Sequence, residues 1–276
     1  MKPIIRRKSV AIAAAALCVS FALSPADAAA QGSDQWKWQA TIYGYLPDIG
    51  GTTTFPQTGA GSDVTVDAET IIDNLKFTFM GSLGAHNGRW GMFTDAIYMD
   101  VGNTRSGFRE LSIGGAPLPG GASANASYDL KGWVWTLGGE WRVASAPTST
   151  LDLVAGARML DIEQTLGWEV TGEVGSIPLP GRAGESTASL TNWDAIVGVK
   201  GRFAFGDRGQ WFVPYYADIG AGDSDFTWQA MGGLGYSFAW GDLVGAWRYI
   251  DYDMKSGGKI ESMTFNGPAI AAVFRW

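Results

Sequence analysis

The end of the chain alternates between two kinds of side chain. Apolar residues stand at every second position from Ile270 through Ala272 and Phe274 to Trp276, and Arg275 falls on the opposite face. Successive residues of a β-strand point to opposite faces, so this segment predicts a strand with one face in lipid and the other in a polar interior. A terminal aromatic ring suits the membrane–water interface. The segment is typical of the C-terminal assembly signal of an outer-membrane barrel.

The start of the chain predicts export. Four basic residues lie within positions 2–8, an apolar stretch too short to span a bilayer covers 10–23, and 26–30 offers A-x-A cleavage sites. This pattern indicates a secretory signal peptide over residues 1–30 and a barrel over 31–276. Cys18, the only cysteine, would be removed with the peptide, so the mature chain must be stable without a disulfide. A lipoprotein reading of Cys18 is poor, because Leu17 precedes it.

The composition narrows the class. Removing residues 1–30 takes away four of the 20 Lys and Arg residues and one of the 27 Asp and Glu residues, which leaves 16 against 26 and a net charge of −10. Such an acidic chain argues against nucleic acid as a partner. Hydrophobic residues make up 46% and charged residues 17% of the sequence, with no apolar run long enough for a spanning helix after position 31. We expect a β-rich membrane protein; the alternative is a soluble sandwich or lipocalin, which would bury the apolar faces inward.

Turn and loop signals divide the chain into ten predicted strands of an all-β, antiparallel transmembrane barrel. Short turns near 87–89, 145–148, 206–209 and 240–242 alternate with long connections over about 47–75, 102–127 and 164–188 and briefer ones near 221–225 and 255–259, as in barrels with short periplasmic turns. The predicted strands are about 35–46, 76–87, 89–101, 127–144, 150–163, 188–205, 210–220, 226–239, 242–254 and 260–276. Eight or twelve strands remain possible, the latter if 62–67 joins the sheet. A short helix is expected over 68–75, folding over or into the barrel mouth.

The facing of side chains supports the barrel. Tryptophan and aliphatic residues recur on one face of strand after strand, and charged residues share the other face with Gly and Thr. A tryptophan-rich face that repeats on many strands favours contact with lipid over a packed interior. Two aromatic girdles are predicted: an inner one of Trp36, Trp90, Trp141, Trp211, Trp240 and Trp276, and an outer one of Tyr98, Trp133, Trp228 and Tyr249.

The same facing sends charges of both signs into the lumen. Six of them are expected near mid-depth: Asp95, Glu140, Arg158, Lys200, Asp218 and Arg248. Opposite charges in a narrow interior predict ion pairs that fill it, because an unpaired buried charge is costly. The functional alternative is an arginine-rich constriction that favours small anions. Gly233 and Gly235 are expected to leave room for Arg248.

Several motifs resemble a family of proteobacterial outer-membrane β-barrel proteins. They are Trp193-Asp194-Ala195-Ile196-Val197-Gly198-Val199-Lys200-Gly201-Arg202, Ala217-Asp218-Ile219-Gly220, Asp225-Phe226-Thr227-Trp228-Gln229-Ala230, Trp247-Arg248-Tyr249-Ile250-Asp251-Tyr252-Asp253 and Gly267-Pro268. The similarity extends upstream through Asp73-Asn74-Leu75 and Arg89-Trp90-Gly91-Met92-Phe93-Thr94-Asp95 and so covers most of the mature chain. The resemblance implies an outer-membrane barrel and no particular activity.

The sequence predicts a non-enzymatic, porin-like barrel of a Gram-negative cell envelope, acting as a narrow pore or a structural component. His86, the only histidine, flanks a periplasmic turn, whereas hydrolases of acyl groups need a His base near the outer leaflet. No catalytic, cofactor-binding or metal-ligating residue is therefore assigned. The expected partners are outer-membrane lipid, lipopolysaccharide, the barrel-assembly machinery and small solutes. An outer-leaflet lipid-modifying enzyme, a surface protease, and an adhesin or receptor acting through the loops remain alternatives.

Overall fold

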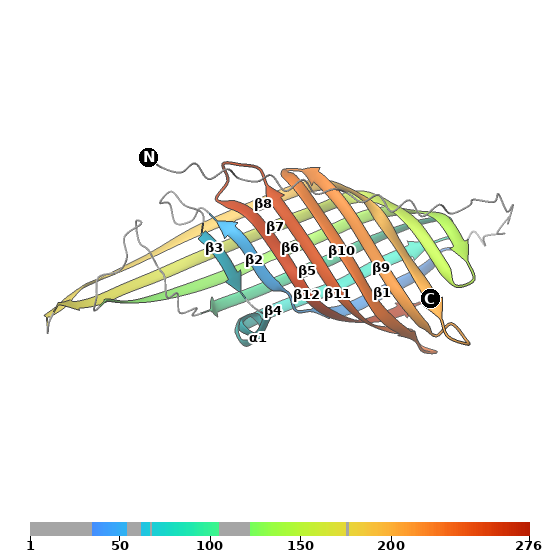
Figure 1. Cartoon of the computed structure of the whole chain (residues 1–276), viewed down its shortest axis with the longest axis horizontal. Coiled ribbons are helices and arrows are strands. Elements are labelled where there is room, and N and C mark those ends of the chain that lie inside the picture. Colours follow the sequence, from blue (N-terminus) through green and yellow to red (C-terminus); the bar gives the residue numbers. More distant parts are fainter. Residues whose placement is uncertain (1–34, 54–61, 67, 105–121, 175–176) are drawn as a thin grey trace, which may run out of the picture. The chain divides into compact units, whose positions relative to one another are not determined.

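The computed structural model describes residues 35–53, 62–66, 68–104, 122–174 and 177–276, and the predicted signal peptide lies outside these ranges. Within them the chain forms strands and one helix (Figure 1). These are β1 (Lys37–Tyr45), β2 (Asp48–Thr53), β3 (Ser62–Val66), α1 (Ala68–Asn74), β4 (Leu75–His86), β5 (Trp90–Thr104), β6 (Ala122–Ala146), β7 (Ser149–Val174), β8 (Ile177–Phe205), β9 (Trp211–Gly222), β10 (Ser224–Ser237), β11 (Asp242–Met254) and β12 (Ile260–Arg275).

Ten of these strands close into an antiparallel barrel. From β4 to β12 each strand pairs with the next along the chain, and β1 closes the ring by pairing with both β4 and β12. The closure reaches the last residue, since Trp276 N donates to Trp38 O at 3.1 Å and Trp38 N donates to Trp276 O at 2.9 Å. A closed ring leaves no sheet edge within a membrane, so every ladder hydrogen bond is made internally. The predicted all-β fold with ten strands is confirmed.

The first long connection contains structure of its own. After a break at Leu46 and Pro47, β2 continues along the outer part of β12 and forms a hairpin with β3, which explains why a twelve-strand count could be considered. The expected helix is present as α1, whose first backbone N–H, at Ala68, donates to Asp48 Oδ1 at 2.8 Å. It is too short to cross a membrane, and no helix among the described residues is long and apolar enough to do so.

The loop predicted over 164–188 is wrong. There β7 and β8 continue as a paired ladder up to Val174 and Ile177, and β6 pairs with β7 from Ala122 onward, so three strands extend past the end of β9 (Figure 1). Proline and glycine in this stretch suggested a loop. Pro178 is tolerated because this part of β8 pairs with β7 alone and so lies at the edge of the sheet.

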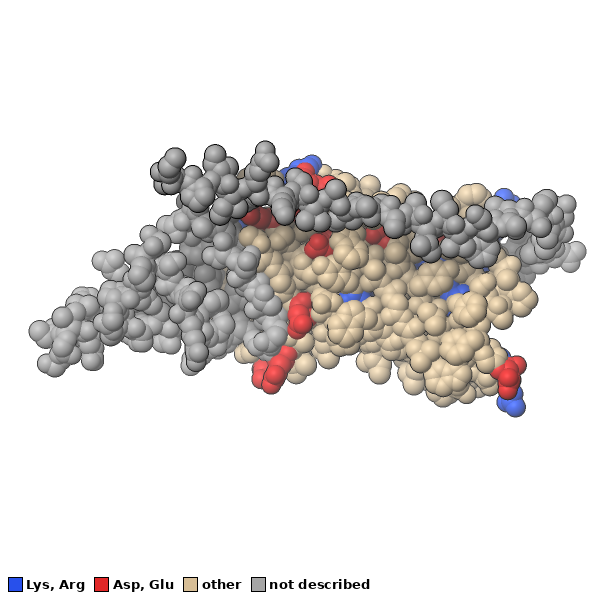
Figure 2. Space-filling view, in the orientation of Figure 1, with Lys and Arg blue, Asp and Glu red and all other residues tan. Residues whose placement is uncertain are grey.

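The polarity of the two faces inverts along the strands. On the lower part of β11, next to the short turns, Trp247 faces outward and Arg248 is buried inside. Toward the other end Asp251 faces outward, and Ile250 and Tyr252 are buried inside with no exposed surface. The lower part therefore has the polarity of a lipid-facing barrel, and the outer part has that of a water-soluble one. Figure 2 shows a broad, mostly uncharged surface, with most of the visible acidic side chains toward the left-hand end of the view.

Pairs of packed aromatic residues mark this change. Tyr98 packs on Trp133 and Trp228 on Tyr249, each with ring centroids 4.6 Å apart, on the outer surface. In the register, the next outward positions beyond the first pair are Asp100 and Lys131. These four aromatic residues are those predicted for the outer girdle. At the opposite end Trp90 stacks on Trp141, with centroids 6.0 Å apart, within the predicted inner girdle.

The outer part of the lumen is filled by a buried apolar cluster, here called the outer core. It consists of Tyr45, Ile49, Ile71, Met80, Ile97, Met99, Val101, Leu130, Val134, Leu160, Ile162, Ile250, Tyr252, Met254, Ile260, Met263 and Phe265. Most of its members are strand residues that point inward. Ile71 is different, because it comes from α1. The sequence predicts a polar lumen throughout, and the outer core shows that this prediction is wrong for its outer part.

Candidate functional site: the lumen

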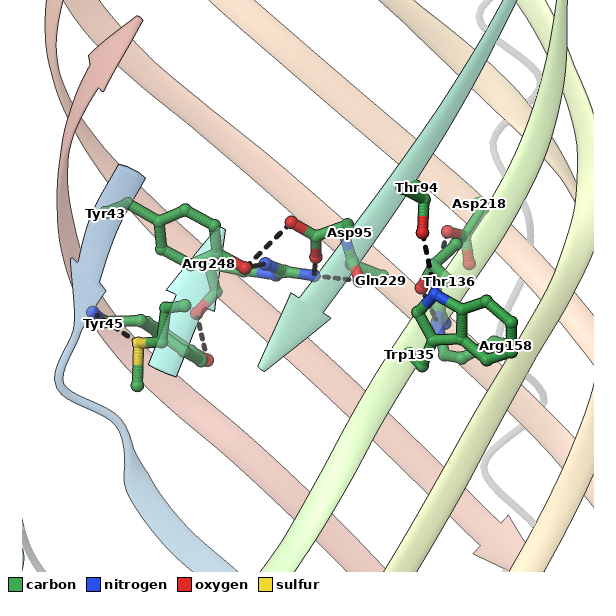
Figure 3. A network of polar contacts seen from close by, with 11 residues as sticks. Tyr43, Tyr45, Thr94, Asp95, Trp135, Thr136, Arg158, Asp218, Gln229 and Arg248 are labelled. Carbon is green, nitrogen blue, oxygen red and sulfur yellow. Dashed lines mark hydrogen bonds and ion pairs between the residues drawn. The ribbon is translucent and has the colours of Figure 1, made fainter. Parts of the chain in front are cut away.

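Below the outer core, a polar network centres on Arg248 of β11 (Figure 3). Its guanidinium donates to Asp95 Oδ2 at 2.7 Å, to Gln229 Oε1 at 3.2 Å and to Tyr43 Oη at 3.1 Å. Tyr43 in turn donates to Asp95 Oδ1 at 2.8 Å. The residues come from β1, β5, β10 and β11, so the network ties strands across the closure of the barrel.

A second pair, also in Figure 3, joins Arg158 of β7 to Asp218 of β9. Both side chains are fully buried, and Arg158 Nε also donates to Thr136 Oγ1 at 3.4 Å. Asp194 stands opposite Arg158 in the β7–β8 register and accepts hydrogen bonds from Ser224 N and Ser224 Oγ, both at 2.8 Å. Arg158 is therefore the cation that faces two buried carboxylates.

The third pair is Lys200 Nζ and Glu140 Oε1, 2.5 Å apart. With it, the six residues predicted for the mid-depth network form three ion pairs inside the barrel. The geometry is what a space-filling network requires, since each charge lies against an opposite one. Whether the network only fills the interior or also selects solutes remains a prediction.

Two arginines at the end with the short turns also face the lumen, as the alternation of side chains predicts, but they lie outside the mid-depth set. Arg202 of β8 and Arg275 of β12 both bind the buried carboxylate of Asp242, Arg202 through Nη1 at 3.3 Å and Arg275 through both terminal nitrogens. Arg202 also donates to Ser237 Oγ at 2.9 Å. Asp242 begins β11 directly after a turn, and it was read as a turn residue. Its inward register was the signal that could have found it.

The expectation that Gly233 and Gly235 leave room for Arg248 is wrong. A Cβ on Gly235 would lie 2.2 Å from the ring of Phe212, and one on Gly233 would lie 2.3 Å from Gly245 O. Gly235 thus leaves room for Phe212, and not for Arg248. The ring is held below Arg202, whose guanidinium carbon lies 3.5 Å from the ring centroid. Gly235 therefore allows the Phe212 ring to form part of the lumen wall at the end with the short turns, here called the mouth of the lumen.

His86, Glu140 and Asp152 place possible metal ligand atoms within 4.8 Å of one another. Each is already engaged: Asp152 binds Arg142, Glu140 binds Lys200, and His86 Nδ1 accepts a hydrogen bond from Gly88 N at 2.7 Å. Nε2 of the same ring lies 3.7 Å from Asp152 Oδ1. These contacts favour a cluster that anchors the short turn over a metal site. His86 lies beside a short turn, as predicted.

A cavity of about 260 Å³ occupies the lumen between the Arg248 network and the mouth. Its wall includes Phe93, Phe212 and Tyr216 with Lys200 and Arg202. The lumen thus has three levels: an apolar outer core, a paired polar layer, and a chamber that reaches toward the end with the short turns.

No protein-family model and no curated protein matches the chain. Solved structures with a similar fold include the outer membrane protease OmpT from Escherichia coli, with 9% identity over 88% of this chain and 97% of that chain and a TM-score of 0.42. Others are the attachment invasion locus protein Ail of Yersinia pestis (10%, 88% and 99%, TM-score 0.28) and the translocator domain of the autotransporter NalP from Neisseria meningitidis (15%, 87% and 88%, TM-score 0.34). One is a protease, one an attachment protein and one a translocator domain, and with TM-scores below 0.5 the likeness assigns none of these roles to this chain.

Proposed function

We propose that this protein is a structural component of the bacterial outer membrane whose barrel is closed to solutes. The observation that carries the proposal is the outer core, which fills the outer part of the lumen with packed apolar side chains, nearly all of them contributed by the barrel strands. Side chains fixed to the strands of a closed ladder cannot leave together as a lid would. A lumen filled in this way supports a closed barrel.

The exterior supports the membrane location. Large apolar side chains such as Ile42, Val197 and Ile270 face outward, with more than half of their surface exposed. In water such a surface would drive aggregation, whereas lipid accepts it. The predicted signal peptide supplies the route, and lipid, lipopolysaccharide and the assembly machinery are the proposed partners.

A non-enzymatic role is part of the proposal. The single histidine of the sequence lies beside a short turn, at the end opposite to the outer core. In the proposed orientation this end faces the periplasm, away from substrates in the outer leaflet. Its ring is also engaged by the turn and by Asp152. These contacts support a structural role for His86.

A second candidate, a gated pore, is favoured by one contact. Ile71 of α1 is part of the outer core and only 2% exposed, so one element of the plug comes from a connection and could move independently of the strands. Displacing α1 would remove one member of the core above the polar layer.

Planar-bilayer conductance of the refolded protein separates the two functions. The structural proposal predicts no stable channel for the native chain. Ile71→Asp is the informative variant and Ile72→Asp its matched control, because the neighbouring Ile72 is 52% exposed. Conductance in Ile71→Asp alone selects the gated pore. Steady conductance of the native chain would contradict closure by the outer core.

A further inference from the structure

The structure points to a binding site for a small organic anion in the luminal chamber, and we propose a carboxylate attached to a compact apolar body as its ligand class. This inference does not depend on whether the barrel conducts. It rests on the chamber's charge, on the chemistry of its mouth and on its aromatic walls.

The charge of the chamber is positive. Four basic residues line it, Lys200, Arg202, Arg248 and Arg275, against two acidic ones, Asp95 and Asp242. Glu140 does not line the chamber, but it pairs with Lys200 and so adds a third negative charge. The four basic and three acidic groups together leave a net charge of +1. An anion entering the chamber would reduce this excess.

The excess is located at the mouth. Arg202 and Arg275 share one carboxylate, Asp242, so the group of three carries a net charge of +1. Arg275 remains 46% exposed in its side chain, so solvent reaches the site. A guanidinium presents a planar fork of N–H donors that matches a carboxylate. Because Arg202 and Arg275 share the single carboxylate of Asp242, the two guanidiniums together can bind a second carboxylate.

The walls select more than charge. Phe212 lies flat below the Arg202 guanidinium, and Phe93 and Tyr216 meet edge to face with centroids 6.1 Å apart. Met231, Val244 and Ala271 also line the chamber. A site with a few placed polar groups on apolar walls is typical of small-molecule pockets, and inorganic anions would leave these walls without a partner.

The volume limits the size of the ligand. About 260 Å³ corresponds to the liquid volume of roughly nine water molecules. This accommodates a single-ring or short-chain acid and not a lipid with long acyl chains. The floor of the chamber is the Arg248–Asp95–Tyr43 network, so entry is from the end with the short turns, which faces the periplasm in the proposed orientation.

The test is a ¹⁹F NMR titration of 4-fluorobenzoate into the refolded full-length barrel in zwitterionic micelles, with neutral 4-fluorobenzamide as the ligand control. We expect saturable binding of the acid and none of the amide. Arg275→Gln should weaken binding roughly fivefold or more, through the loss of a charge-assisted contact. Asp242→Asn should have the opposite effect and tighten binding, because both guanidiniums lose their internal competitor.

Arg208→Gln is the matched control, since it removes the same charge from an exposed turn outside the chamber and should leave binding unchanged. Native heat-modifiability establishes that each variant is folded, and Arg202→Gln replaces Arg275→Gln if the latter fails this check. The proposal is overturned if the folded native chain does not bind the acid, or if the amide binds equally well. It is also overturned if Arg208→Gln weakens binding as much as Arg275→Gln does, or if Asp242→Asn weakens binding. Competition by inorganic phosphate at the same concentration as by benzoate would overturn the role of the apolar walls.

Discussion

At the scale of single residues, buried ion pairs inside the lumen are the decisive contacts. Arg158 and Asp218 are both fully buried and bonded to each other, and Asp194 is a further buried carboxylate opposite Arg158. Removing one partner of such a pair leaves an uncompensated charge where water cannot solvate it, which costs far more than the pair contributes. Removing one partner of a buried ion pair is therefore expected to lower the stability of the barrel more than replacing both partners by apolar residues.

Arg158→Ala is expected to lower the free energy of unfolding by about 3–5 kcal/mol, since the carboxylate of Asp218 stays buried. Arg248→Ala should act in the same direction through Asp95.

Urea unfolding of the refolded protein, followed by tryptophan fluorescence, measures both. The double change of Arg158→Met with Asp218→Leu should recover only part of the loss, because Asp194 stays buried without a cation. The control is Lys131→Ala, which breaks a half-exposed pair with Glu163 and should leave the transition unchanged. Equal stability of Arg158→Ala and the native chain would contradict the pairing.

At the scale of elements, the last strand completes the barrel. β12 pairs with β11, with β1 and with β2, and its terminal residue makes two backbone hydrogen bonds to Trp38. Deleting Trp276 or replacing it with Asp is expected to impair insertion, because the strand loses its interfacial anchor and part of its closure. Membrane fractionation and heat-modifiability measure the outcome. Unchanged outer-membrane accumulation of the folded form would show that the terminal residue is dispensable.

The extension of β6, β7 and β8 is expected to be separable from the barrel. Replacing residues 168–184 with Asn-Gly joins the paired residues Gly167 and Glu185 through a two-residue turn. The melting temperature should change by less than about 4 °C, the shift that about 1 kcal/mol gives in a chain of this size. A much larger loss, or failure to fold, would mean that the extension stabilises the barrel.

The number and order of the barrel strands could be predicted, because most strands alternate between polar and apolar residues with tryptophan on one face. Two features escaped. Pro178 and neighbouring glycines made the 164–188 stretch look like a loop, since turn residues dominate a local reading and strand pairing is a long-range effect. The outer core escaped because Ile250 and Tyr252 continue the alternation of β11 in the same register as Arg248. Only the change in outward residues, from Trp247 to Asp251, signals that the strand has left the membrane.

At the scale of the whole molecule, orientation decides which compartment meets the chamber. The proposed topology places the turn at Arg208 in the periplasm and the β11–β12 turn at Ser256 outside the cell. A membrane-impermeant maleimide on intact cells should label Ser256→Cys, and label Arg208→Cys only after the outer membrane is permeabilised. Cys18 lies in the predicted signal peptide, so the mature chain would give no background. The reverse pattern would turn the chamber toward the outside.

The two faces of the barrel exchange polarity at the outer aromatic residues, so the strands leave lipid at that level. The most direct measurement compares two arginine substitutions on the outward face of β8, each by the free energy of unfolding in lipid bilayers. Val197→Arg lies below the aromatic residues and should cost about 2–4 kcal/mol, whereas Ser189→Arg lies above them and should cost about 0–1 kcal/mol. Equal costs at the two positions, or a larger cost at Ser189, would contradict this placement of the membrane.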